Sequence, residues 1–283
     1  MKPSIGLHVS GAGGLAEAPA RARALGCECF QFFSRSPRGG GAPTISAETA
    51  ALFKTRCKTW KLDSYIHAPY YINFASSNNR ISFGSVSAMR EELERGSLLK
   101  VKYVMTHLGS SSGLEENAAL KQVIARVQEI FDPKKGGPYR TKLLLEISAG
   151  AGAVIGDTFE ELAAIVKGVG RTDLGICLDT CHLFASGYDI RTSAAITTTM
   201  RAFKKHLPLS RFQLVHANDS LYGFGEHRDR HTDIGDGELG VETFRQLLAH
   251  QDFQGRNFIL ETPGEDPRRK KDVALLKKLR MES

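Results

Sequence analysis

The sequence contains no long hydrophobic run. No stretch of its 283 residues approaches the roughly 18 uncharged apolar residues that a membrane-spanning helix needs. The first residues, Met1–His8, include a lysine and a proline and lack the apolar core of a secretion signal. We therefore expect a protein without membrane contacts that is located in the cytoplasm.

Cysteine is also scarce. The five cysteines are an odd number and lack the paired Cys-x-x-Cys spacing of a zinc knuckle, which argues against a disulfide framework. Reduced thiols in a cytosolic compartment fit this usage. Cys177 and Cys181 lie in the segment Cys-Leu-Asp-Thr-Cys-His, where they are candidate metal ligands. We interpret them instead as small buried residues, because free cysteine is among the most buried residue types.

Negative charge is in the minority. The chain has 38 Lys+Arg against 31 Asp+Glu, a formal net charge of +7. This balance favours an anionic partner through long-range electrostatic attraction, with nucleic acid as the first candidate; solubility alone is the alternative explanation. The hydrophobic fraction of 41% excludes a disordered or fibrous chain.

Short apolar or β-branched runs alternate with segments of helical period along the whole chain. We predict eight strands, at Ser4–Ser10, Cys27–Phe33, Ser64–His67, Tyr103–His107, Lys142–Ile147, Leu174–Asp179, Phe212–His216 and Asn257–Glu261. We predict helices near Leu15–Leu25, Ala47–Trp60, Val86–Leu99, Glu115–Phe131, Phe159–Gly168, Ser193–His206, Val241–His250 and Arg268–Leu279. This alternation predicts an α/β fold, a single (β/α)8 TIM barrel spanning residues 1–283 as one domain, with the active site at the carboxyl ends of its strands.

A doubly wound sheet is the structural alternative. Gly11–Ala16 matches the G-x-G-x-x-A pattern of a dinucleotide-binding turn between a strand and a helix. Such a site needs an acidic residue at the end of the second strand, where this chain has Gln31–Phe33, and Glu28 comes too early. We therefore interpret the glycines as a tight turn.

Six of the eight predicted strands end on a histidine or a carboxylate. These residues are His67, His107, Glu146, Asp179, His216 and Glu261. Any one of them alone is more often a satisfied polar cap, but in a barrel all six converge on one basin. Imidazole and carboxylate are zinc-type ligands, and cations remove the cost of crowding charges at desolvated positions.

Two further clusters extend this set. His182 follows the sixth strand, and Asp229 and His231 lie two residues apart in a loop from which both can chelate. The total is five histidines and four carboxylates. At three or four protein ligands per zinc, with one carboxylate shared, nine ligands indicate three ions.

Four segments make the pattern specific. They read Gly-x-His-Val-Ser-x-x-Gly-Gly over 6–14, Leu-Asp-Thr-Cys-His-x-Phe-Ala-x-Gly-Tyr-Asp over 178–189, His-x-Asn-Asp-Ser over 216–220, and Asp-Arg-His-x-x-Ile-Gly-x-Gly over 229–237. In this order, from about residue 5 to residue 262, the chain resembles endonuclease IV, the trizinc family of apurinic/apyrimidinic endonucleases.

The resemblance implies a TIM-barrel DNA repair enzyme. It would cleave the phosphodiester 5′ to abasic sites in duplex DNA by trizinc-assisted hydrolysis, leaving a 3′-hydroxyl and a 5′-deoxyribose phosphate, and would also trim blocked 3′ ends. The implied cofactors are three zinc ions, with manganese as a substitute at one or more sites. The implied partner is duplex DNA with abasic or 3′-blocked sites, bound by a monomer in the cytoplasm at the nucleoid.

The resemblance also assigns ligands. It places His67, His107 and Glu146 at the first zinc; Glu146 as a bridge with Asp179, His216 and Glu261 at the second; and His182, Asp229 and His231 at the third. Glu146 and Glu261 are the implied catalytic carboxylates, the latter also orienting or deprotonating the nucleophile.

The residues expected to meet DNA follow the early strands. Arg38, Tyr70 and Tyr71 match family positions that enter the minor groove and kink the duplex. His8 is expected to touch substrate. We expect four further arginines to contact phosphates: Arg35, Arg191, Arg228 and Arg230. Gly39–Gly41 replaces a tryptophan found in relatives, which predicts a weaker wedge.

Charge and competing functions complete the expectations. We expect positive charge to concentrate at the carboxyl mouth of the barrel, whereas the basic run Arg268–Lys271 is interpreted as a solvated helix face behind it. A metal-dependent sugar isomerase on the same barrel is the rival enzyme, disfavoured by the five histidines, the net charge and the Asp229/His231 chelate. A non-catalytic zinc- or DNA-binding protein would require a broken ligand set, and none of the nine ligands is missing.

Overall fold

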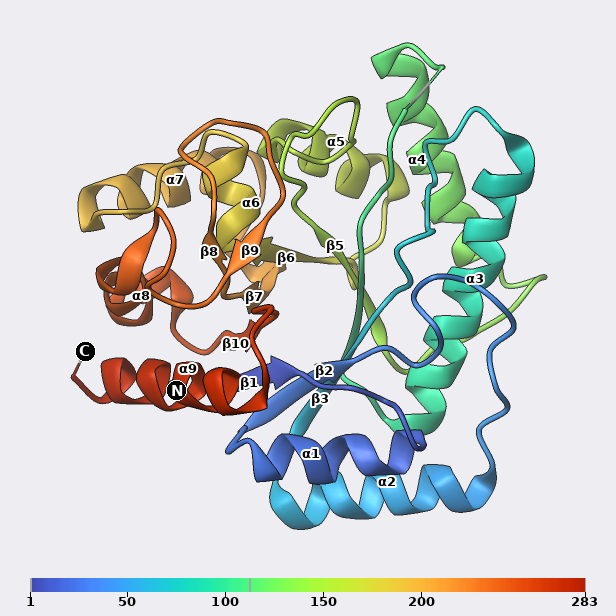
Figure 1. Cartoon of the computed structure of the whole chain (residues 1–283). Helices are drawn as coiled ribbons and strands as arrows, with labels where there is room; N and C mark the ends of the chain where they lie inside the picture. Colours follow the sequence, from blue (N-terminus) through green and yellow to red (C-terminus); the bar gives the residue numbers. More distant parts are fainter. Residues whose placement is uncertain (1, 112, 283) are drawn as a thin grey trace.

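Eight parallel strands close into a barrel in the computed structural model, which describes residues 2–111 and 113–282. The strands are β1 (Ile5–His8), β2 (Cys29–Phe32), β3 (Asp63–His67), β4 (Tyr103–Thr106), β5 (Lys142–Glu146), β6 (Gly175–Asp179), β7 (Phe212–His216) and β10 (Asn257–Leu260). Their order around the barrel is β1-β10-β7-β6-β5-β4-β3-β2, with β1 pairing both β2 and β10 (Figure 1). The predicted TIM barrel is confirmed, and the doubly wound alternative is wrong because the sheet has no open edge.

Helices surround this barrel. They are α1 (Ala18–Ala24), α2 (Ala47–Trp60), α3 (Asn79–Leu99), α4 (Glu116–Ile130), α5 (Phe159–Val169), α6 (Thr180–Ala185), α7 (Ser193–His206), α8 (Gly240–Ala249) and α9 (Asp266–Glu282). Short 3-10 turns lie at Leu15–Glu17, Leu209–Arg211 and Gln251–Phe253, and β8 (Asp219–Ser220) pairs with β9 (His231–Thr232). No helix of the described residues is long and apolar enough to cross a membrane.

Two helices differ from the prediction. α3 begins at Asn79, well before the predicted Val86, because Asn78 accepts a hydrogen bond from the Arg80 amide and caps the first turn. Its first residues are mostly polar, which hides the helical period. α6 was not predicted; it begins directly after β6, where the Asp179 carboxylate accepts from the His182 amide at 2.9 Å.

The core forms two layers. Inside the barrel lies a small set of buried residues: Cys29, Tyr65, Tyr103, Met105, Leu144, Cys177, Leu214 and Ile259. A larger apolar layer fills the space between the strands and the helices. Cys177 and Cys181 are fully buried, which confirms that they are buried residues.

The amino end of the barrel is closed by ordinary polar contacts. Arg280 on α9 donates to both carboxylate oxygens of Glu28, at 2.6 and 2.9 Å, and also to the Pro3 carbonyl, which joins the two ends of the chain. The Ile5 amide donates to Glu28 as well. Between the barrel strands, the Tyr103 hydroxyl is 2.7 Å from the Gln213 side-chain oxygen.

Positive charge is not confined to the carboxyl end. A groove of about 540 Å³ at the amino ends of β3 and β4 is lined by five lysines: Lys54, Lys58, Lys61, Lys100 and Lys102. These lysines lie on or just after α2, directly after α3, and before β4, so part of the positive charge lies at the amino end of the barrel, away from the carboxyl mouth.

Candidate metal centre

The carboxyl ends of the strands bring the predicted ligands together. The last residues of β3, β5, β6 and β7 are His67, Glu146, Asp179 and His216, all of them buried. His107 and Glu261 directly follow β4 and β10. Because all strands are parallel, these side chains share one face of the barrel, as the sequence predicts.

The nine predicted ligands form three groups. Within each group, the nitrogen and oxygen atoms that could bind an ion lie within 4.8 Å of one another. The groups are His67, His107 and Glu146; Glu146, Asp179, His216 and Glu261; and His182, Asp229 and His231. They coincide with the sets implied by the family resemblance, and Glu146 belongs to two of them.

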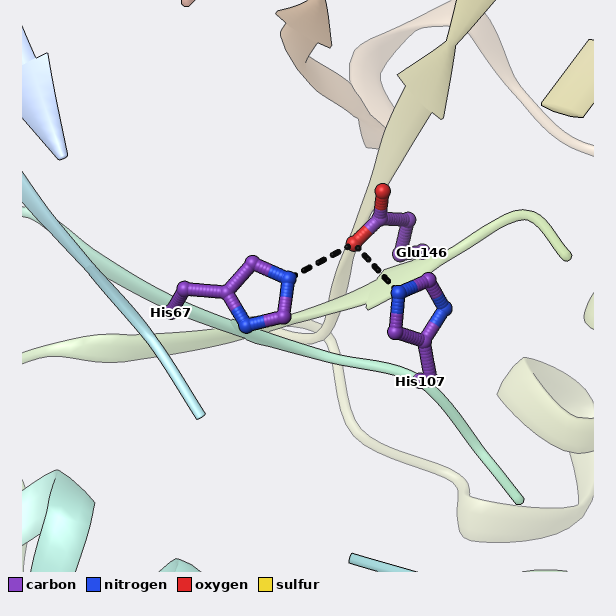
Figure 2. A group of neighbouring side chains, drawn as sticks. All are labelled: His67, His107 and Glu146. Atoms are coloured by element: carbon purple, nitrogen blue, oxygen red, sulfur yellow. Dashed lines mark ion pairs between the residues drawn. The ribbon is translucent and has the colours of Figure 1, made fainter. Parts of the chain in front are cut away.

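The first group centres on Glu146. Figure 2 shows the imidazoles of His67 and His107 pointing at one carboxylate oxygen, Oε2, which lies 3.5 Å from each Nε2 atom. This oxygen is buried and has no hydrogen-bond partner among the residues that the structure describes. A buried carboxylate oxygen is costly without a partner, and a cation between these three groups would satisfy it.

Three histidines of the cluster each have one ring nitrogen facing a carbonyl oxygen. The pairs are His67 Nδ1 with Ala68 O at 2.6 Å, His182 Nδ1 with Ile147 O at 2.9 Å, and His216 Nε2 with Gln31 Oε1 at 2.8 Å. A nitrogen that faces a carbonyl oxygen carries the hydrogen, so the other ring nitrogen offers its lone pair to the site. Histidines that bind metals are held in this way.

Two amides that the sequence prediction missed organise the second group. Besides facing His216, Gln31 on β2 donates to Glu261 at 2.5 Å. Asn218 donates to Asp179 Oδ2 at 2.6 Å, and its own oxygen accepts from the Glu261 amide at 2.7 Å. Gln31 stands out only as an amide within a phenylalanine-rich strand, whereas Asn218 lies in the segment shared with relatives.

The third group lies nearest the surface. Asp229 Oδ1 is 3.3 Å from His182 Nε2 and 3.4 Å from His231 Nε2, and the two imidazole nitrogens are 3.4 Å apart. His182 is 2% exposed, whereas the Asp229 side chain is 51% exposed. Two nitrogens this close to each other and to a carboxylate form a chelating set that is open on one side.

Charges in this cluster compensate one another. Burial alone would raise the pKa of Glu146, but His216 and His107 lower it well below its ordinary value. Burial would lower the pKa of His182, but Asp179 and Asp229 raise it to about 10. The pKa values of His67 and His216 are raised as well, so protons on these three histidines balance the carboxylates, and cations would displace those protons on binding.

Two buried cysteines, Cys177 and Cys181, lie beside the candidate ligands and are held as neutral thiols. The Sγ atom of Cys177 lies within 4.8 Å of ligand atoms of Glu146 and His216, and that of Cys181 lies near Asp179 and His231. Burial raises the pKa of Cys177 to about 12 and raises that of Cys181 also. Burial therefore favours the neutral thiols over the thiolates that bind metal, as expected for cysteines that serve as small buried residues.

Comparison with known proteins identifies relatives of the whole chain. Residues 19–279 match the family model described as a xylose isomerase-like TIM barrel. The chain is 39% identical to a probable endonuclease 4 of Methanosphaerula palustris, covering 92% of this chain and 91% of the relative. The crystal structure of endonuclease IV from Thermus thermophilus superposes with a TM-score of 0.88 at 32% identity, covering 99% of this chain and all of that one.

The chain belongs to the endonuclease IV family. A probable endonuclease 4 of Aquifex aeolicus is 37% identical over 93% of the chain. A D-tagatose 3-epimerase-like protein has a TM-score of 0.73 at 21% identity, so it shares the fold alone.

In this protein, a cavity of about 480 Å³ opens over the candidate metal centre. Besides ligand residues, it is lined by His8, Tyr70, Arg230 and Arg269. The Tyr70 ring packs edge-on against Phe33, with ring centroids 5.1 Å apart, and its side chain remains 66% exposed. His8, Tyr70 and Arg230, the residues predicted to meet substrate, therefore line the same cavity as the candidate metal ligands.

The remaining predicted DNA contacts lie outside this cavity. Tyr71 is 36% exposed next to Tyr70, and Arg38 is exposed in the loop after β2. Arg191 pairs with Asp189, and Arg228 lies 3.8 Å over the Tyr222 ring.

Two interpretations of arginines are wrong. Arg35 is 8% exposed and pairs with both Glu91 and Glu92 at 2.6 Å, so its charge is already compensated by carboxylates and it is not an exposed phosphate contact. Of the run predicted as a solvated face, Lys270 and Lys271 are exposed, whereas Arg268 and Arg269 are engaged by other groups because the start of α9 lies beside the cavity. Arg268 pairs with three aspartates, and Arg269 donates to the His8 carbonyl.

Proposed function

We propose that this protein hydrolyses the phosphodiester on the 5′ side of abasic sites in duplex DNA. The products would be a 3′-hydroxyl and a 5′-deoxyribose phosphate. The observation that carries this proposal is the buried, unpartnered oxygen of Glu146 at the junction of two His/carboxylate groups, in a chain of the endonuclease IV family. Trimming of blocked 3′ ends is proposed as a side activity of the same centre.

The donor set fits three zinc ions, with manganese as a substitute. His67, His107 and Glu146 would hold the first, and His182, Asp229 and His231 the third. The second would be held by Glu146, Asp179, His216 and Glu261. Ions held there would acidify a water molecule and neutralise phosphate charge, which is the chemistry that phosphodiester hydrolysis requires.

Gln31 and Glu261 would position the groups that take part in this hydrolysis. Gln31 fixes one Glu261 oxygen, while the other, Oε2, lies 3.4 Å from His216 Nδ1, within the second group of candidate ligands. Glu261 is therefore both a ligand and the carboxylate placed to orient the attacking water. Rigid placement of this kind lowers the barrier because the reacting groups need no further reorganisation.

Exposed residues at the rim would engage DNA. Arg38, Tyr70 and Tyr71 would enter the minor groove, where aromatic side chains can occupy the space left by unstacked nucleotides. Arg230 would contact a phosphate beside the ions, and His8 would touch the substrate from the end of β1. A monomer at the cytoplasmic nucleoid is sufficient for this reaction, since one chain contains all nine ligands.

The test uses a duplex with one tetrahydrofuran abasic analogue and a 5′ label on the damaged strand. We expect a single incision on the 5′ side of the analogue, a product that a DNA polymerase extends, and loss of incision with a zinc chelator. Zinc should restore the activity. The same duplex with an ordinary nucleotide is the control. No incision, or incision that the chelator leaves unchanged, would overturn the proposal.

A further inference from the structure

The loop that contains Arg38 is held at both ends by one guanidinium group. This loop, residues 34–43, follows β2 and is called the Arg38 loop below. Arg95 on α3 donates to the backbone carbonyl of Ser34 at its first residue and to the carbonyl of Pro43 at its last, the latter at 2.7 Å. The Ser34 hydroxyl accepts a third hydrogen bond from Arg95, also at 2.7 Å. Arg95 is only 7% exposed.

A buried carboxylate adds to these hydrogen bonds, and Arg95 and Glu92 with their bonds to the loop ends are called the clamp below. Glu92, one turn before Arg95 on α3, is fully buried and accepts from the Ser34 hydroxyl and from Arg35, each at 2.6 Å. A buried charge network gains little net stability over apolar packing, because desolvation opposes the attraction. Its hydrogen-bond geometry does, however, restrict the loop ends to one arrangement.

Apolar packing does little to hold the middle of the Arg38 loop. A cavity of about 740 Å³ lies between it and the loop after β1, and Pro37 and Pro43 line this cavity. His8 and Arg269 line both this cavity and the one over the metal centre, so the two are neighbours. Gly39 has a φ angle of 116°, and a side chain there would meet nothing within 4 Å.

A backbone hydrogen bond joins the loop to the tyrosine segment. The Tyr70 amide donates to the Pro37 carbonyl at 3.1 Å. Arg38 follows Pro37 directly, so the placement of Pro37 affects both the exposed guanidinium and the exposed ring. The hydrogen bonds at the base of the loop therefore bear on the position of both groups relative to the candidate metal ligands.

We propose that Arg95, held in place through Ser34 and Glu92, is a positioning residue that aligns the Arg38 loop with the metal centre for recognition of abasic DNA. This inference rests on the proposed function. Arg95 does not touch the substrate; it acts through Arg38 and Tyr70. Loss of the clamp should reduce discrimination between damaged and intact duplex and leave the hydrolytic step nearly unchanged.

The main variant is Arg95→Lys, which keeps the charge but cannot reach Ser34 and Pro43 together with one ammonium group. The matched control is Arg90→Lys on the same helix, because Arg90 donates to the carbonyls of Glu129 and Ile130 at the end of α4, away from the site. Ser34→Ala is a milder second variant that deletes only the hydroxyl between Glu92 and Arg95. Thermal unfolding and zinc content verify that each variant is folded and loaded.

Steady-state incision and anisotropy binding supply the readouts. For Arg95→Lys, we expect the KM for abasic duplex to rise about tenfold, the kcat to change less than about twofold, and affinity for intact duplex to stay nearly constant. Ser34→Ala should move KM in the same direction by about threefold. The Arg90→Lys control should match the wild type.

A double-mutant cycle separates positioning from a merely structural role. If Arg95 acts through the loop, Arg95→Lys should add little to the loss caused by Arg38→Ala. Fully additive losses, a fall in kcat with KM unchanged, or wild-type kinetics in Arg95→Lys would overturn the inference. Failure of the wild type to incise abasic DNA would instead overturn the proposed function, so the two failures are distinguishable.

Discussion

The two ends of the barrel use glutamate carboxylates in opposite ways. At the amino end, both oxygens of Glu28 receive hydrogen bonds, from Arg280 and from the Ile5 amide. At the carboxyl end, Glu146 is more deeply buried, yet its Oε2 atom lacks a partner among the described residues and faces two imidazoles. At the amino end of the barrel, a glutamate therefore links the two ends of the chain. At the carboxyl end, a glutamate is left available to bind a cation.

The largest effect should come from Glu146→Gln, which changes one oxygen to an amide at nearly constant volume. Because Glu146 belongs to two groups, we expect bound zinc to fall from about three ions to about one per chain. Incision should fall on the order of a thousandfold, since several kcal/mol of charge stabilisation are lost. Elemental analysis and incision assays check this. Full zinc content in the variant would show that Glu146 is not a bridging ligand.

A pair of glutamine variants sharpens the comparison between the ends. Gln31→Leu removes the acceptor that orients His216 and the donor to Glu261, so zinc affinity or activity should fall about 10- to 100-fold. Gln213→Leu makes the same change at the amino end, where the partner is Tyr103, and should leave zinc affinity unaltered. Competition with a chromophoric chelator measures both. Equal zinc affinities for the two variants would show that Gln31 does not support metal binding at the carboxyl end of the barrel.

Arg280→Ala should have the smallest effect on incision, with less than about a twofold change, but should destabilise the fold. Because Glu28 is partly exposed, the expected loss in unfolding free energy is about 1–2 kcal/mol at neutral pH. Denaturant titration measures it. Incision reduced as strongly as in Glu146→Gln would contradict the division between the two ends.

The same variant predicts a pH dependence. Burial alone would raise the pKa of Glu28, but hydrogen bonds from Arg280 and the Ile5 amide lower it below the ordinary value. The ionised form is therefore favoured by folding, and its contribution is present at neutral pH and lost as pH falls through the lowered pKa. The stability difference between wild type and Arg280→Ala should shrink in acid. A difference that grows in acid would contradict this ion pair.

The barrel fold and the strand-end histidines and carboxylates could be predicted from the sequence, because short local patterns indicate them. A histidine or carboxylate closing a strand is visible in one short run, and the barrel topology brings such ends together. Gln31, Arg35 and Arg269 could not be assigned, because their roles depend on partners far along the chain: Glu261, Glu92 and the His8 carbonyl, respectively. Long-range pairing distinguishes a surface arginine from a buried one, and composition does not encode it.

Stepwise zinc titration into chelator-stripped protein tests the central claim most directly, with bound zinc and incision of abasic duplex measured on the same samples. We predict that incision stays low until bound zinc approaches about three ions per chain and then reaches its full value. Full incision by the zinc-free protein, or none with all three ions bound, would contradict the account of the carboxyl end as a metal-dependent DNA incision site.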